Sequence, residues 1–391
     1  MHNIKRSVRA GAWSVSKTLA ASIVCAVSAV GAVGIAASST AYADEVKEST
    51  VDQAKVYWVG HSLISGSDPY ELHSPSLITV LGDLARAGGK QYHYHKHTIP
   101  GAPIGWNWGV PDGKVPDLIA PLLDKSHKDY GTYNVMVVTE GVNIERTYNY
   151  WASDFYMRKF ALAARAANPK ARVYLYESWH HYNAGDEEYR REYGPNESYD
   201  WKAYQRKVRS VWESIADQAA DPKRTRPADN YRYVYEAEFG PDPATGDDRL
   251  EIYIIPTGQV VVDVLDRLAE QRKGDDWSYA KAARNGQLSG ADFFVNPLVN
   301  FPKDMKTLAH PECPAGQWDC KSGKLGTLDD IHPSHLLVYL NAVVHYSVIY
   351  QANPVGLPAL YGVPDNLAKL FQEVAWARVS SDARTGVGSK P

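Results

Sequence analysis

The sequence predicts an α/β protein in which a mostly parallel β-sheet lies between two layers of helices. Short apolar runs rich in β-branched and aromatic residues alternate with longer segments of helical periodicity, as in repeated βαβ units. Motifs with catalytic potential directly follow several of these runs, and such sheets bind their ligands at the carboxyl ends of the strands. The 391 residues, 44% of them hydrophobic, have an ordinary globular composition. A formal net charge of −3 gives no basic excess, so nucleic acid is not an expected partner.

The amino-terminal segment differs from the rest of the chain. Four basic side chains precede an apolar run of small residues at 19–37, and the Ala-Tyr-Ala sequence that ends at Ala43 offers a cleavage site. We predict a signal peptide over residues 1–43 and a secreted or periplasmic mature chain, 44–391, without membrane contact. The alternative is a membrane anchor, because the apolar run approaches the length that spans a bilayer.

The first expected strand is the run of β-forming residues at 56–59, which ends at Gly60. Ser62 follows at the carboxyl end of this strand, where its hydroxyl can lie in a crevice of the sheet. A serine is a weak nucleophile until a base accepts its proton, so a catalytic role requires a base elsewhere in the chain. His61, between the two, would pack or bind a neighbouring carbonyl group.

The next two elements are a helix at 74–88, capped by its first serine and stopped by two glycines, and a strand at 91–98. Histidines alternate along this strand and would share one face. They could bind a metal, but no acidic or thiol ligand accompanies them. We therefore expect a solvent-facing edge strand, no metal site and no other cofactor. The three histidines are His93, His95 and His97.

The segment 101–116 is rich in glycine, proline and tryptophan and should form a loop. Its indoles, Trp106 and Trp108, could stack on a sugar ring, since aromatic side chains combine apolar area with a polar edge. Each of them could instead pack into the core. The next expected strand, 133–139, ends at Glu140, which would either support the site or be exposed to water.

A helix at 151–167 and a strand at 172–176 continue the alternation. The polar, aromatic insertion at 178–200 follows this strand, so it should overhang the active-site side of the sheet. We expect Trp179 and His180 in this insertion to form a wall of the substrate site, and the alternative is that the charge-rich insertion is a solvated surface loop.

The remaining elements lie in the carboxyl-terminal half, in which a second insertion covers 221–310. A polar tail from residue 382 should be frayed. We treat 44–391 as one catalytic domain. The expected elements are a helix at 201–220, a strand at 251–256 and helices at 258–271 and 336–350.

After signal removal the chain has two cysteines, Cys313 and Cys320. In an oxidising compartment an even pair at this spacing is expected to form a disulfide. A metal site is the alternative, but it would need more ligands than two cysteines supply.

A candidate base lies near the other end of the chain, in the sequence TLDDIHPSH at 327–335. Asp329 stands three residues before His332, and a carboxylate there could orient an imidazole that accepts the Ser62 proton. Asp330 could replace Asp329 if the local turn differs. His335 could be the base if the following helix begins earlier.

At these residues the chain resembles the SGNH (GDSL-like) hydrolases, which carry Gly-Asp-Ser after the first strand and Asp-x-x-His near the end. Here His61 stands in place of the first motif's acid. The resemblance implies a five-stranded, flavodoxin-like sheet in a three-layer α/β/α sandwich, with Ser62, Asp329 and His332 as the triad.

The family's two intermediate motifs supply an oxyanion hole. The sequence TIPGA at 98–102 resembles the first and places a backbone donor on Gly101. The second, Gly-x-Asn-Asp, matches Gly141 and Asn143 but not its final position. The resemblance therefore implies that the oxyanion is bound by the N–H groups of Ser62 and Gly101 and by the amide of Asn143.

The resemblance also implies a serine esterase. Similar exported SGNH proteins remove acetyl groups from polysaccharides, and the 11 Trp and 26 Tyr favour an acetylated carbohydrate as the partner over a long-chain ester. Two alternatives stay open, namely O-acetyl transfer to a polysaccharide by the same triad and a non-catalytic polysaccharide-binding protein. The presence of the triad together with Asn143 favours an enzyme.

Overall fold

The structure is a computed structural model. It describes residues 51–65, 75–109, 117–142, 144–181, 200–221, 249–271 and 331–388, all within one compact unit, Val46–Pro391. The predicted signal peptide, the pair Cys313 and Cys320, and most of the insertions at 178–200 and 221–310 lie outside the described residues.

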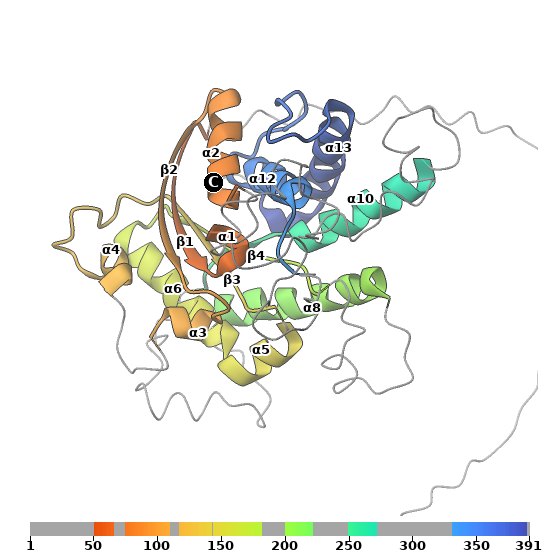
Figure 1. Cartoon of the computed structure of the whole chain (residues 1–391). Coiled ribbons are helices and arrows are strands. Elements are labelled where there is room, and N and C mark those ends of the chain that lie inside the picture. Colours follow the sequence, from red (N-terminus) through yellow and green to blue (C-terminus); the bar gives the residue numbers. More distant parts are fainter. Residues whose placement is uncertain are drawn as a thin grey trace, which may run out of the picture. The chain divides into compact units, whose positions relative to one another are not determined.

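The described strands form a five-stranded sheet in which every neighbouring pair is parallel (Figure 1). The strand order β2-β1-β3-β4-β5 is that of flavodoxin-like doubly wound sheets. The predicted α/β fold class is therefore confirmed. The strands are β1 (Gln53–Gly60), β2 (Gln91–Thr98), β3 (Val135–Thr139), β4 (Arg172–Tyr176) and β5 (Ile252–Ile255).

Two apolar cores, one on each face of the sheet, create the three layers. Successive side chains of a strand point to opposite faces, so Val56 and Trp58 enter one core and Tyr57 and Val59 the other. The first core packs against α2 (Leu77–Ala87), α10 (Thr257–Gln271), α12 (His335–Ile349) and α13 (Asp365–Ser381). The second packs against α6 (Ser153–Ala167) and α8 (Trp201–Ala220).

Several short helices follow strand ends or join larger elements. They are α1 (Ser62–Ser65), α3 (Ile104–Asn107), η3 (Asp117–Ile119), α4 (Ala120–Leu123), α5 (Ile144–Trp151) and η6 (Ala383–Thr385). Of these, α1, α3 and α5 come shortly after the carboxyl ends of β1, β2 and β3, which is the edge where the site was predicted.

Most predicted boundaries differ from the observed ones by a few residues. Helix α2 is capped by Ser76, whose hydroxyl accepts the Thr79 N–H at 3.2 Å, and not by Ser74. The helix predicted at 151–167 begins at Ser153 because Ala152 adopts a left-handed conformation with φ of 50°. Ala152 thereby separates α6 from α5, an element that was not predicted.

The prediction of a frayed tail is wrong for residues 382–388. Arg384 forms a two-pronged ion pair with Asp217 on α8, with N–O distances of 2.6 and 2.8 Å. The Gly386 carbonyl accepts hydrogen bonds from Arg172 and Gln351. These contacts fix the end of the described chain against β4 and α8.

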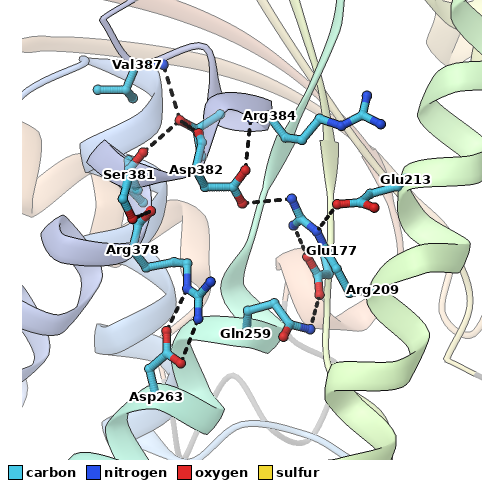
Figure 2. A network of polar contacts seen from close by, with 12 residues as sticks. Glu177, Arg209, Glu213, Gln259, Asp263, Arg378, Ser381, Asp382, Arg384 and Val387 are labelled. Atoms are coloured by element: carbon cyan, nitrogen blue, oxygen red, sulfur yellow. Dashed lines mark hydrogen bonds and ion pairs between the residues drawn. The ribbon is translucent and has the colours of Figure 1, made fainter. Parts of the chain in front are cut away.

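A polar network also joins the carboxyl end of β4 to surrounding helices (Figure 2). Glu177, which is fully buried, binds the Arg209 guanidinium, and its other oxygen accepts from Gln259 at 2.7 Å. Arg209 also binds Glu213 at 2.9 Å and Asp382 at 2.7 Å. One arginine thus connects β4, α8 and the segment after α13.

Among the described helices, none combines the length and apolarity needed to cross a membrane.

Candidate active site

The candidate nucleophile, Ser62, is the first residue of α1 and is 9% exposed. The chain can turn here because Gly60 has no side chain. A Cβ atom at Gly60 would lie 2.5 Å from Thr139 Cγ2 on β3 and 2.8 Å from Ile64 Cδ1. Both distances are far shorter than a van der Waals contact, so glycine is required for β1 to pass the end of β3 this closely.

The candidate base, His332, reaches Ser62 from the far end of the chain. His332 Nε2 lies 2.8 Å from Ser62 Oγ, although the two residues are 270 positions apart in sequence. This distance is within the reach that a base needs to take the proton of a hydroxyl nucleophile. His335, the alternative base, is instead the first residue of α12, and burial lowers the pKa of its imidazole.

His61 has the role that the sequence left open, that of binding a neighbouring carbonyl group. Its Nε2 donates to the Glu140 carbonyl at 2.9 Å, and its Nδ1 accepts the Leu63 N–H at 3.4 Å. Burial lowers the pKa of His61 to about 4, so the ring is neutral near pH 7. His61 therefore ties the Ser62 turn to the end of β3.

A tight turn at residues 99–102 carries the predicted oxyanion donor, Gly101. The Ala102 N–H donates to the Ile99 carbonyl at 3.0 Å, and Gly101 has a φ of 67°. Proline at the second position and glycine with positive φ at the third are typical of a type II turn. The Ile99 N–H donates to the Gly60 carbonyl at 2.9 Å, which holds the turn beside the residues that lead to Ser62.

Three predicted site residues lie outside the described chain. They are Asn143, the proposed side-chain oxyanion donor, and Asp329 and Asp330, the two candidates for orienting His332. Gly141, which precedes Asn143 by two residues, is described and buried.

The prediction that Trp179 forms a wall of the substrate site is wrong, because the indole is only 1% exposed. Its Nε1 donates to the Ile331 carbonyl at 2.7 Å. Ile331 immediately precedes His332, so Trp179 anchors the segment that carries the candidate base. No local sequence signal indicated this contact, which joins residues 152 positions apart.

His180 is also buried, at 7% exposure, and this corrects its predicted role as an open wall. Its N–H donates to Gln205 Oε1 at 2.9 Å, and its carbonyl accepts from the Trp201 indole at 2.9 Å. Its ring packs edge-on against Tyr204 with 4.7 Å between centroids. The residue thus docks the chain after β4 onto α8.

The two tryptophans after the Gly101 turn are half-buried against the second core. Trp108 packs edge-on against Phe160 on α6, with centroids 4.8 Å apart. Trp106 packs edge-on against Trp151 at the end of α5, with centroids 5.4 Å apart. Tyr150, in turn, contacts Trp151 and is 43% exposed. Aromatic side chains of α3 and α5 are therefore in contact with each other. These two helices follow the segments that carry the predicted oxyanion donors, Gly101 and Asn143.

The histidines of β2 are placed at an edge strand as predicted, but they do not all face solvent. His97 is 1% exposed and bonds the Asn107 carbonyl at 2.7 Å, while His95 stacks on Tyr57 with 5.0 Å between centroids. Within the described ranges, no group of three or more His, Cys, Asp or Glu side chains is arranged to hold a metal.

No protein-family model matches the chain, and no curated protein matches it. Among solved structures, a DUF4886 family protein from Bacteroides uniformis ATCC 8492 is similar in structure, with 12% sequence identity and a TM-score of 0.45. The match covers 84% of this chain and 96% of the other.

Proposed function

We propose that this protein is an exported serine esterase of the SGNH type that removes O-acetyl groups from a polysaccharide or other carbohydrate. The observation that carries the proposal is the 2.8 Å contact between Ser62 Oγ and His332 Nε2 at the carboxyl end of a parallel sheet. The order of the sequence motifs supports the assignment to this family. The predicted signal peptide supports export to a secreted or periplasmic location.

The proposed reaction has two steps. His332 Nε2 takes the Ser62 proton as Oγ attacks the ester carbonyl, and the same proton is then given to the departing sugar hydroxyl. Water next attacks the acetyl-serine with His332 again as the base, and acetate leaves as Ser62 Oγ regains its proton. Asp329 would keep the His332 imidazole in the tautomer that can accept this proton.

The negative oxygen of each tetrahedral intermediate needs hydrogen-bond donors. The proposed donors are the N–H groups of Ser62 and Gly101 and the side-chain amide of Asn143. The left-handed conformation of Gly101 and its turn beside Gly60 support this role for its segment. One such donor is worth about 3 kcal/mol in the transition state.

The aromatic contacts around α3 and α5 support a carbohydrate substrate. Trp106, Trp151 and the exposed Tyr150 offer stacking surfaces of the kind that sugar rings use. Acetyl transfer to a polysaccharide would use the same Ser62 and His332 chemistry, with a sugar hydroxyl replacing water in the second step.

The test is acetate release from an aryl acetate and from a panel of acetylated polysaccharides, with Ser62→Ala and His332→Ala as inactivating variants. We expect either change to reduce turnover by about 1,000-fold or more. His335→Ala is the matched control and should retain activity. If Ser62→Ala and the wild type release acetate equally, the esterase proposal is wrong.

Two additions to this assay separate the alternatives. Acetyl groups that appear on an added sugar acceptor, in place of free acetate, would identify a transferase. Asp329→Asn and Asp330→Asn, measured side by side, would show which carboxylate orients His332, because only the correct one should reduce turnover strongly.

A further inference from the structure

We infer that Glu140 is a positioning residue for the oxyanion hole, because its carboxylate holds together the two backbone segments that carry the oxyanion donors. This inference rests on the proposed function. Glu140 is the residue directly after β3 and is fully buried, which excludes the water-exposed alternative that the sequence left open.

A single carboxylate oxygen binds both segments. Glu140 Oε1 accepts the Gly141 N–H at 2.6 Å and the Ile104 N–H at 3.0 Å. Ile104 lies three residues after Gly101, and Gly141 lies two residues before Asn143. The contact therefore fixes the distance between a segment after β2 and a segment after β3, each of which supplies one proposed oxyanion donor.

The backbone of Glu140 contacts the third participating segment. Its carbonyl accepts the His61 Nε2–H at 2.9 Å, and His61 immediately precedes Ser62. Glu140 thus touches the nucleophile turn through its main chain and both oxyanion segments through its side chain. Oxyanion donors act only when they are held at the position where the charge develops, so this residue lies where it can set their geometry.

The electrostatic setting of Glu140 distinguishes it from an ordinary structural carboxylate. Burial raises its pKa to about 7, while the Ser153 hydroxyl and the N–H donors of Gly141 and Ile104 act in the opposite direction. In the part of the chain that the structure describes, Glu140 has no ion pair. Among the described residues, no hydrogen-bond partner of regular geometry is found for its second oxygen, Oε2, and the nearby Ser153 hydroxyl interacts with the carboxylate. A buried acid without a compensating cation costs stability, and such groups are concentrated at functional sites.

Removing the carboxylate would leave two buried N–H groups without an acceptor and release both segments. A displacement of about 1 Å at a reacting centre can reduce the rate on the order of a hundredfold. Glutamine at this position keeps one carbonyl oxygen that can accept both bonds, so it should restore most of the geometry.

The test measures how fast an aryl phosphonate labels Ser62 in the full-length protein, because the phosphonyl oxygen occupies the oxyanion hole. We expect Glu140→Ala to slow labelling by about a hundredfold and Glu140→Gln by less than about tenfold. Glu177→Gln is the matched control, since it removes an equally buried carboxylate after the neighbouring strand. It should lower the melting temperature and slow labelling by less than about twofold, because its partners lie on α8 and α10.

Amide hydrogen exchange gives a second measurement that does not depend on activity. In Glu140→Ala, exchange at Ile104 and Gly141 should accelerate, while the strand amides of β1 and β3 remain protected. Unchanged exchange at both positions would overturn the inference, as would labelling of Glu140→Ala at the wild-type rate. If the wild type itself is not labelled, the proposed function is wrong, and the positioning role is overturned with it.

Discussion

Two buried glutamates occupy equivalent places at the ends of neighbouring strands, and they are used differently. Thr139 and Tyr176 are register partners in the β3–β4 pair, so Glu140 and Glu177, which follow them, are equivalent positions. Both side chains are fully buried. Glu177 is paired with Arg209 and bonded by Gln259, whereas the carboxylate of Glu140 is bonded by backbone N–H groups of Ile104 and Gly141.

Under the proposed function, one edge of the sheet serves stability at β4 and chemistry at β3. The Glu177 network joins elements of the scaffold and compensates its charge with a guanidinium (Figure 2). Glu140 joins loops that carry proposed catalytic groups, and its charge is not compensated by an ion pair in the described chain. The role of a buried carboxylate in a parallel sheet is therefore indicated by its hydrogen-bond and ion-pair partners, and not by its burial alone.

The largest expected effect comes from removing the cation of Glu177. Arg209→Met leaves a buried carboxylate without its ion pair and should lower the free energy of unfolding by about 3 kcal/mol or more at pH 7. Denaturant unfolding measures this value. Arg206→Met is the control, because its pairs with Asp263 and Asp266 are partly exposed and should be worth less than about 1 kcal/mol. If both variants lose the same free energy of unfolding, the buried pair of Glu177 with Arg209 contributes no more than an exposed pair. Glu177 and Glu140 would then not differ in how their charge is compensated.

A smaller effect of opposite sign is expected at Glu140. The folded-state pKa of about 7 lies above the unfolded value near 4.5, so the folded protein binds this proton more tightly. The resulting stabilisation is fully present below about pH 4.5 and is lost as the pH rises through 7. Glu140→Gln should therefore raise the free energy of unfolding by up to about 3 kcal/mol at pH 8 and by less than about 1 kcal/mol at pH 5.

The measurement is thermal or denaturant unfolding of both proteins at the two pH values. Burial also raises the pKa of Glu177, but the Arg209 guanidinium opposes this shift. Glu177→Gln should therefore lose stability at pH 8, because it removes an anionic partner of the largely buried Arg209. If Glu140→Gln also loses stability at pH 8, the charge of Glu140 is compensated after all and the comparison fails.

The smallest effect is expected at Trp179, which lies two residues after Glu177. Trp179→Phe keeps most of the buried ring but removes the N–H that binds the Ile331 carbonyl. A loss of about 1 kcal/mol is typical for one such bond, and it should reduce kcat about fivefold with little change in KM. Trp212→Phe, a buried indole on α8, is the control for ring size. A fall in kcat of equal size in both variants would assign Trp179 a packing role only.

Local patterns in the sequence were sufficient for most of the scaffold. Strand β4 and helix α8 have the predicted boundaries, 172–176 and 201–220, because apolar periodicity and capping agree there. Helix α13 was not predicted, although Leu367, Leu370 and Phe371 have helical spacing. Helix α5 was not predicted either, although Ile144, Tyr148 and Trp151 have helical spacing along its eight residues.

The site was predictable only where residue type itself carries the chemistry. A serine after a strand and a histidine near the end of the chain identified the pair that the structure brings to 2.8 Å. Trp179 follows the carboxyl end of a strand, as a substrate-facing residue would. Its side chain is buried instead because it binds the Ile331 carbonyl, 152 positions away in the sequence. The sequence likewise did not distinguish a Glu140 side chain that supports the site from one exposed to water, because its buried position depends on the Ile104 N–H.

The separation of Ser62 and His332 along the chain has a consequence for how activity is acquired. The nucleophile turn belongs to a central strand near the start of the described chain, whereas His332 precedes the almost entirely buried helix α12. The pair can form only after that helix has docked, and contacts of such long range are slow to close. Under the proposed function, esterase activity would therefore appear late in folding, so hydrolysis of a reporter substrate would measure how much of the protein has folded completely.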